Sequence, residues 1–309
     1  MARPFFIDTD TASDDAVAII IALRHPEIDV VGMSIVAGNV PLAMGLQNAL
    51  YTAEMCGSNV PIYAGADRPL KRLLATAQNV HGNDGMGDIG LPLSGRLPVS
   101  GDGVDALIAA AHEHAGELTL VTLGPLTNIA LALGRDPSIV KKIRRCVVMG
   151  AAADHIGNVT PVAEFNMWCD PDAVEVVLAS GMNLEFVGWD ISRKYAVVSD
   201  AQAKVVRGVG TELAQFAIDI QCVVAEFCAN ETHIEGFDLP DPIAMAYAID
   251  ENIATEVREM YLAVETNSPH TLGMVVMDTL GITHHKPNAK VVTSADADLF
   301  ISMLVAAVK

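Results

Sequence analysis

Four aspartates lie close together near the N-terminus of the 309-residue chain, in the stretch FIDTDTASDDAVAIIIALRHP. Asp8 and Asp10 follow a short apolar run, and Asp14 and Asp15 open a long one. Helix capping explains one or two of these carboxylates, but it does not explain four, because like charges at short range repel each other. A hard cation such as Ca²⁺ or Mg²⁺ relieves that repulsion and prefers carboxylate oxygens. The cluster therefore predicts a metal site.

An Asp-x-Asp pair after a first strand is also typical of phosphatases that form an aspartyl phosphate. Those enzymes carry Thr or Val two residues after the second aspartate, and here that position is Ala12. A magnesium-dependent phosphohydrolase with Asp8 as its nucleophile is therefore a weaker alternative, and it stays open at this point.

Later segments carry further polar side chains that could bind an ion or a substrate. GNVTPVAEFN contains Asn158, Glu164 and Asn166. Asp241 opens another apolar stretch, LPDPIAMAYAID, where N-capping alone is the simpler explanation. HGNDGMGD contains His81, which by itself is an ordinary loop histidine. No Ser-His-Asp or Cys-His set can be recognised.

The elements that must position these residues follow from the hydrophobic pattern, in which apolar strands alternate with helices. Strands are expected at 4–7, 30–36, 60–64, 118–123, 146–149 and 184–187, with short ones near 260–264 and 273–277. Helices are expected at 14–24, 42–55, 104–114, 126–133, 171–179 and 296–308, and residues 200–249 should be largely helical. This alternation predicts one α/β domain over residues 1–309, an open, mostly parallel β-sheet flanked by helices.

Polar or glycine-containing segments follow several predicted strands at their carboxyl ends. They include Asp8 and Asp10, Gly38-Asn39, Gly124-Pro125 and Gly150. Residues 67–103 form a long segment rich in Gly and Pro, and segments of that length are usually functional or mobile. Since sites in open α/β sheets form outside the carboxyl ends of the strands, we expect the site there.

Composition narrows the choice of partners and compartment. The net charge of −19 argues against nucleic acid and against anionic membranes as partners. No uncharged apolar run approaches the roughly 20 residues of a membrane span. The five cysteines form no C-x-x-C pair, and the N-terminus becomes acidic too early for a signal peptide. We therefore expect reduced, buried thiols in a cytoplasmic protein.

With these residues in view, the chain resembles the nucleoside hydrolase family, including its inosine–uridine preferring members, over essentially its whole length. Seven motifs occur in the family's order: DTDTASDDA, VAGN, HGNDGMG, LGPLTNIALAL, VVMGAA, GNVTPVAEFN and DPDA. The aspartate motif together with AEFN is highly specific. The resemblance implies Ca²⁺-dependent hydrolysis of the N-glycosidic bond of ribonucleosides, giving free nucleobase and ribose.

The resemblance also implies roles for individual residues. Its metal ligands would be Asp10, Asp15, Asp241 and the backbone carbonyl of Leu123. Its ribose-binding residues would be Asp14, Asn158, Glu164 and Asn166. Asp10 would also be the general base that activates a metal-bound water, and Asn39 would help to order the ion and the water. The binding partner would be a small-molecule ribonucleoside. The protein itself would be a homo-oligomer, either a dimer or a tetramer.

The expected nucleobase pocket contains one departure from the family pattern. Inosine–uridine preferring members carry a His just before the last metal aspartate, and purine-specific members carry a Trp there, whereas this chain has Pro240. His81 could take over protonation of the leaving base, His233 is a weaker candidate, and Met149 would complete the pocket. The nucleobase preference is therefore open, and a ribose- or nucleoside-binding protein without turnover is the alternative.

Overall fold

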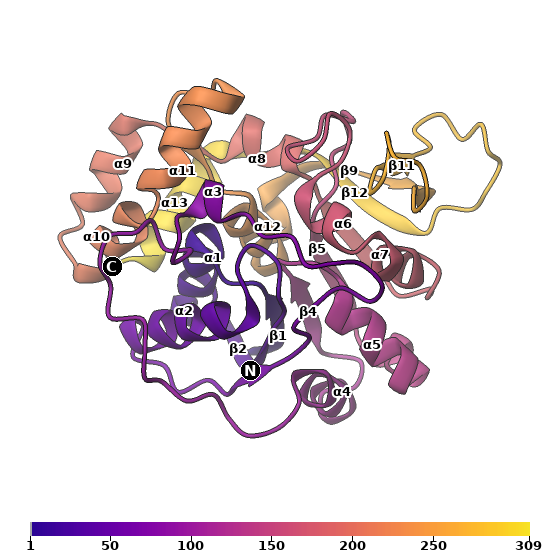
Figure 1. The fold of residues 1–309 in the computed structure, drawn as a ribbon, viewed down its shortest axis with the longest axis horizontal. Coiled ribbons are helices and arrows are strands. Elements are labelled where there is room, and N and C mark those ends of the chain that lie inside the picture. The colour runs from indigo at the N-terminus through magenta and orange to yellow at the C-terminus, as the bar shows by residue number, and fades with distance from the viewer. Residues whose placement is uncertain (1) are drawn as a thin grey trace.

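An eight-stranded sheet forms the centre of the computed structural model, which describes residues 2–309 (Figure 1). Its strands, in spatial order, are β3 (Ile62–Ala64), β2 (Ile28–Ile35), β1 (Arg3–Thr9), β4 (Thr119–Thr122), β5 (Arg145–Met149), β6 (Leu184–Val187), β12 (Ala289–Ala295) and β9 (Ala254–Met260). All neighbours pair in parallel except β9, which is antiparallel to β12. The predicted open, mostly parallel sheet is confirmed.

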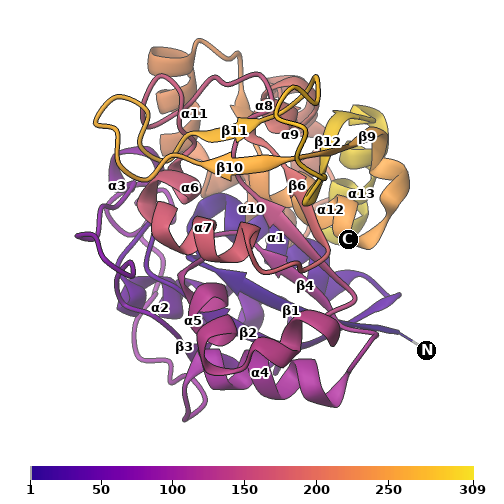
Figure 2. The same ribbon diagram turned by 90° about the vertical axis from the view of Figure 1, so that its right-hand side faces the viewer.

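Helices cover both faces of the sheet, because alternate strand residues point to opposite sides (Figure 2). Phe5 and Ile7 join one apolar core, and Phe6 joins the other. The first core is closed by α1 (Ser13–Arg24), α2 (Leu42–Met55), α12 (Pro240–Ile249) and α13 (Ala297–Ala307). The second is closed by α4 (Gly103–Glu113), α5 (Thr127–Arg135) and α7 (Pro171–Leu178).

Shorter elements surround this framework. The remaining helices are α3 (Gln78–His81), α6 (Phe165–Cys169), α8 (Trp189–Tyr195), α9 (Asp200–Arg207), α10 (Glu212–Asp219), α11 (Cys222–Phe227), the 3₁₀ turns η1 (Pro137–Lys141) and η3 (Glu251–Ile253), and the π-helical turn η2 (Cys228–Thr232). Two antiparallel pairs join β7 (Val197–Val198) to β8 (Phe237–Asp238) and β10 (Leu262–Val264) to β11 (Val275–Met277). In the part of the chain that the structure describes, no helix is both long and apolar enough to cross a membrane.

The order of the strands creates a crevice between β1 and β4. The chain starts at β1 in the middle of the sheet, runs outward through β2 and β3, and returns to the other side of β1 as β4. The connections that leave β1 and β4 therefore diverge, and ligand sites form at such a switch point. Asp8 pairs with Thr122 across the two strands, so their carboxyl ends lie at the same level.

Three details differ from the sequence prediction. Strands β9 and β12 were not expected, because β9 is an exposed edge strand with mostly charged and polar side chains and β12 mixes polar with apolar residues. The region 200–249 is largely helical as predicted, but β8 interrupts it. The cysteines are free as expected, yet two of them are not buried: Cys56 is partly exposed, and Cys222 is exposed because it lies at the start of a surface helix.

Candidate functional site

Asp10 lies immediately after β1, in a space that two glycines keep open. Its side chain is fully buried, and its Oδ2 accepts a hydrogen bond of 2.6 Å from the backbone N–H of Asn39. A Cβ atom on Gly38 would lie 2.1 Å from that oxygen, and one on Gly124 would lie 2.9 Å from Cγ of Asp10. Both positions therefore need glycine, because any side chain there would collide with the carboxylate of Asp10.

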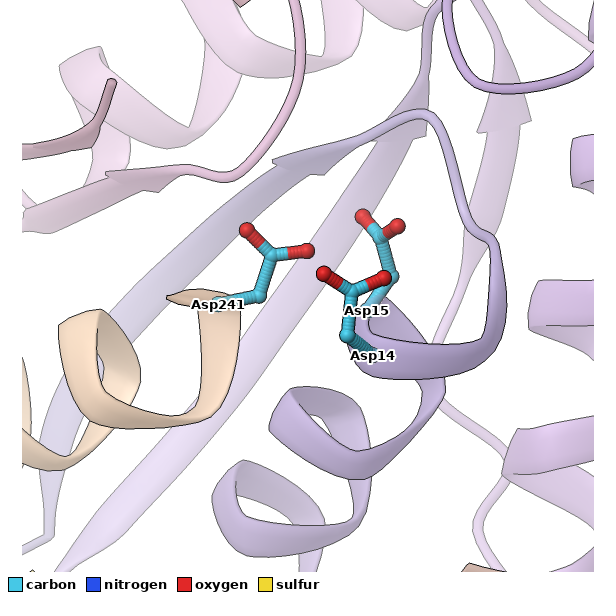
Figure 3. Close-up of side chains that lie close together, drawn as sticks. All are labelled: Asp14, Asp15 and Asp241. Carbon is cyan, nitrogen blue, oxygen red and sulfur yellow. The ribbon is translucent and has the colours of Figure 1, made fainter. Parts of the chain in front are cut away.

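The first turns of α1 and α12 bring three more carboxylates together (Figure 3). Oxygens of Asp14, Asp15 and Asp241 all lie within 4.8 Å of one another, and all three side chains are buried. Asp15 is held by Thr9 Oγ1 at 2.5 Å and by the N–H of Ala12 at 2.8 Å. Oδ1 of Asp14 has no hydrogen-bond partner within residues 2–309.

Burial and mutual repulsion raise the pKa values of these groups. Burial raises the pKa of Asp14 to about 7 and that of Asp15 to about 6, and the charge of Asp14 adds to the latter. Burial, followed by the charges of the other aspartates, raises the pKa of Asp241 well above its usual range, and burial and Asp15 do the same for Asp10. No Lys or Arg forms an ion pair with them among the described residues. This donor set, with one orphaned oxygen, fits a divalent cation.

Asp8 is separate from this group. It is fully buried, and its Oδ2 accepts hydrogen bonds from Ser34 Oγ and, at 2.7 Å, from Asn128 Nδ2. Burial raises its pKa to about 7. The Asp8 carboxylate is thus held in a buried hydrogen-bond network with Ser34 and Asn128, and it does not line the cavity described next, so the structure gives no support to the phosphohydrolase alternative.

A cavity of about 310 Å³ opens above the aspartates, large enough for a small ligand. Most of the expected site residues line it: Asp14, Asn39, His81, Leu123, Met149, Asn158, Glu164, Asn166, Pro240 and Asp241. Asp10 and Asp15 do not line the cavity and are fully buried. His233 is exposed at the end of η2 in a left-handed conformation and does not line the cavity, whereas its neighbour Thr232 does.

Hydrogen bonds fix the polar wall opposite α1. Glu164 caps α6 by accepting from the N–H groups of Asn166 at 2.8 Å and Met167 at 3.2 Å, and burial raises its pKa to about 7. Asn166 Nδ2 donates to the carbonyl of Leu123 at 2.8 Å, which joins this wall to the end of β4. Asn158 Oδ1 accepts from the N–H of Phe165 at 2.9 Å.

His81 enters the cavity from α3, on the opposite side. Its Nδ1 lies 3.0 Å from Ser13 Oγ and 3.6 Å from Oδ1 of Asp14. Burial lowers the pKa of His81 to about 4, so the imidazole is neutral at physiological pH.

The sequence did not single out the individual side chains of the outer part of the cavity. Its lining includes Trp168, Trp189, Phe227 and Asp238. Trp189 lies two residues after the end of β6, so the rule that sites form at strand ends could have found it. Asp238 lies three residues before Asp241 in a short strand that has no clear sequence signal.

Comparisons with known proteins agree over the whole chain. The family model "Inosine-uridine preferring nucleoside hydrolase" matches residues 5–302. The pyrimidine-specific ribonucleoside hydrolase RihA of Salmonella gallinarum is 36% identical over 98% of this chain and 97% of its own length.

Two solved structures have the same fold. A plant nucleoside hydrolase, PpNRh1, superposes with a TM-score of 0.93 at 29% identity, covering 100% of this chain and 99% of that one. A purine-preferring ribonucleoside hydrolase from Gardnerella vaginalis superposes with a TM-score of 0.91 at 28% identity, and the match covers 99% of this chain and 98% of that one. The chain belongs to the inosine-uridine preferring nucleoside hydrolase family and is an N-glycosyl hydrolase.

Proposed function

We propose that this protein is a Ca²⁺-dependent ribonucleoside hydrolase in which Asp10 is the general base. The observation that carries the proposal is the position of Asp10, buried beside a triad of aspartates beneath a nucleoside-sized cavity. Asp10, Asp15, Asp241 and the carbonyl of Leu123 would hold the ion, and Asp14 is close enough to join them. When bound, the cation would lower the pKa of a water molecule and stabilise these buried charges.

The aspartates at the base of the cavity supply both the base and the electrostatic stabilisation. Asp10 removes a proton from the attacking water, and burial raises the pKa of this carboxyl group, which makes it a stronger base than an exposed aspartate. Asn39 holds this carboxylate through its backbone N–H. Positive charge develops on the sugar ring as the glycosidic bond breaks, and the surrounding carboxylates stabilise it.

The polar wall is suited to ribose. Asp14, Asn158, Glu164 and Asn166 all face the cavity and offer acceptors and donors to its hydroxyl groups. A site that hydrogen-bonds each hydroxyl rejects a sugar that lacks one, because its buried polar groups then stay unpaired. We therefore expect 2′-deoxynucleosides to be poor substrates.

Pyrimidine ribonucleosides are the first substrates to try. The relative from Salmonella, 36% identical over nearly the full length, is named for that specificity. The aromatic side chains of Trp168, Trp189 and Phe227 around the outer cavity suit a planar base of either class.

We also propose that the protein is a homo-oligomer. The proposal is supported by two exposed apolar side chains after β11, Leu280 (84% exposed) and Ile282 (73% exposed). Light scattering tests it.

A panel assay tests the proposal. Purified protein is incubated with uridine, cytidine, inosine, adenosine, guanosine and 2′-deoxyuridine, with Ca²⁺, Mg²⁺ or excess chelator, and free base is measured by chromatography. We expect base release from a ribonucleoside with Ca²⁺ and its loss on chelation and in Asp10→Asn. Saturable binding without base release would instead show a binding protein.

A further inference from the structure

The proposed reaction needs a proton donor for the leaving nucleobase. A pyrimidine or purine that departs with the electrons of the glycosidic bond carries negative charge, which a nearby acid relieves. Pro240 supplies no proton, and His233 lies outside the cavity. His81 lines the cavity but is neutral, and a neutral imidazole gives up its proton far less readily than a carboxylic acid.

Asp238 is a buried carboxyl group in the cavity wall that the mechanism above does not use. It ends β8, is 6% exposed, and lines the cavity together with Trp189. The pairing of β8 with β7 places Asp238 opposite Val197 and fixes its backbone. Asp14 and His81 line the same cavity, and the charge of Asp238 raises the pKa of both.

The two oxygens of Asp238 have different surroundings. Oδ2 accepts two hydrogen bonds, one of 3.0 Å from Trp189 Nε1 and one of 2.8 Å from Ser192 Oγ. Within residues 2–309, the one side-chain donor to Oδ1 is the thiol of Cys228, at 3.5 Å. A proton on this carboxyl group therefore resides on Oδ1, because Oδ2 is already an acceptor from two donors. Oδ1 is also the oxygen that keeps hydrogen-bonding capacity for a ligand.

The groups around Asp238 favour its neutral form. Trp189 and Ser192 from α8 are uncharged, and burial raises the pKa of the Cys228 thiol to about 12, so that neighbour is neutral too. Asp14 on α1 is a further carboxylate. Arg193 on α8 stacks on the ring of Trp189 but pairs with Asp154, and Asp238 has no ion pair among residues 2–309. Burial raises the pKa of Asp238, as expected for a carboxyl group without a cation.

We propose that Asp238 is the general acid of this hydrolase and protonates the departing nucleobase through Oδ1. This role rests on the proposed function. As the bond between C1′ and the base nitrogen breaks, its electron pair moves into the base, and the proton on Oδ1 passes to a ring nitrogen or carbonyl oxygen of the base. Water adds its hydroxyl to C1′ and gives its proton to Asp10.

The products are neutral base and ribose, so the step balances. The Asp238 carboxylate that forms is held by the donors on Trp189 and Ser192, and it regains a proton from solvent when the base leaves. A protonated carboxyl group that acts as a donor inside a buried site is an established device in enzymes.

Leaving-group dependence tests the proposal. Asp238→Ala and Asp238→Asn are compared with the wild type on two substrates: the ribonucleoside that the wild type cleaves fastest, and 4-nitrophenyl β-D-ribofuranoside. The nitrophenolate leaves as a stable anion and needs no proton. We expect kcat/KM of Asp238→Ala to fall about 100-fold or more on the nucleoside and to stay nearly unchanged on the nitrophenyl riboside. Asp238→Asn keeps a hydrogen-bond donor but cannot transfer a proton. It should therefore lose activity only on the nucleoside, and the loss should be smaller than that of Asp238→Ala.

The outcomes separate this inference from the function on which it rests. Asp29→Ala is the control, because the side chain of Asp29 is exposed and makes no hydrogen bond within residues 2–309. Equal losses on both substrates, or full nucleoside activity in Asp238→Ala, would overturn the role of Asp238 while leaving the hydrolase proposal intact. Retained nitrophenyl riboside activity shows that a variant is folded. A wild-type protein that releases base from no nucleoside would overturn the proposed function and this inference together.

Discussion

Ser13 Oγ lies 3.0 Å from Nδ1 of His81, at the point where α1 begins. His81 is neutral, so only one of its ring nitrogens carries a proton. When the serine hydroxyl donates to Nδ1, the proton is placed on Nε2, and the ring presents a donor to the cavity. We predict that Ser13 selects the tautomer of His81 in this way.

Ser13→Ala should weaken catalysis through His81. Without the hydroxyl, both tautomers become accessible, and we expect kcat/KM for the best ribonucleoside to fall several-fold. Nitrogen chemical shifts of His81 should show that the preference for one tautomer is lost. Ser302→Ala, at an exposed helical serine, is the matched control. Unchanged shifts in Ser13→Ala would show that another group orients the ring.

Asp10→Asn should abolish most of the activity while the fold is kept. The amide cannot accept the proton of water, and loss of a general base costs about 10²–10⁴-fold in rate. Steady-state kinetics measures the loss, and circular dichroism confirms the fold. Activity within tenfold of the wild type would contradict the role of Asp10.

Gly38→Ala should disable the enzyme because its new methyl group would occupy the position of Oδ2 of Asp10. The carboxylate has to move, so we expect a loss of activity comparable to that of Asp10→Asn. Gly134→Ala is the control, since no atom lies within 4 Å of a Cβ at that position. If Gly38→Ala keeps normal kcat/KM, Asp10 can act from another position.

Glu164 should make stability depend on pH. Its pKa rises from an ordinary value of 4.5 to about 7 on folding, so the folded protein holds this proton more tightly than the unfolded chain. The contribution of Glu164 to the free energy of unfolding is therefore fully present below about pH 4.5. It decreases by up to about 3 kcal/mol as the pH rises to 7. Denaturant unfolding in chelator should show that Glu164→Gln loses stability less steeply over pH 5–7. Parallel curves for the two proteins would contradict the assignment.

The divalent cation should stabilise the folded protein. An ion that binds only the native aspartate cluster stabilises the folded state by RT ln(1 + c/Kd), where c is the concentration of free ion, so the melting temperature rises with the logarithm of the ion concentration once that concentration exceeds the Kd. Thermal unfolding with Ca²⁺, Mg²⁺ and chelator measures the effect. The increase with Ca²⁺ should be smaller in Asp241→Asn, whereas the exposed-site variant Asp29→Asn should behave like the wild type.

The centre of the fold and the placement of the aspartates could be predicted from the sequence. The strands that end at Thr9 and Thr122 are apolar and buried, so their pattern is strong, and the topology of a parallel sheet then brings the residues after them together. Strand β9 could not be predicted, because an exposed edge strand carries no apolar alternation.

The outer cavity could be predicted least. Asp238 is in a two-residue strand whose partner, β7, is about 40 residues away in the chain, and only the folded structure places it beside Trp189. The sequence indicated His233, but its neighbour Thr232 lines the cavity instead. A sequence motif does not show which side chains of a loop point into a cavity.

The cavity consists of two parts with different origins. Its floor, around Asp10 and Leu123, is built from the ends of central strands and is held in place by Gly38 and Gly124. Its rim, with His81, Phe227 and Asp238, comes from peripheral segments between the main elements. Substitutions of apolar rim residues such as Phe227 can therefore alter which base is accepted without disturbing the floor. This division would allow nucleobase specificity to be redesigned at the apolar rim positions while the aspartate floor is kept.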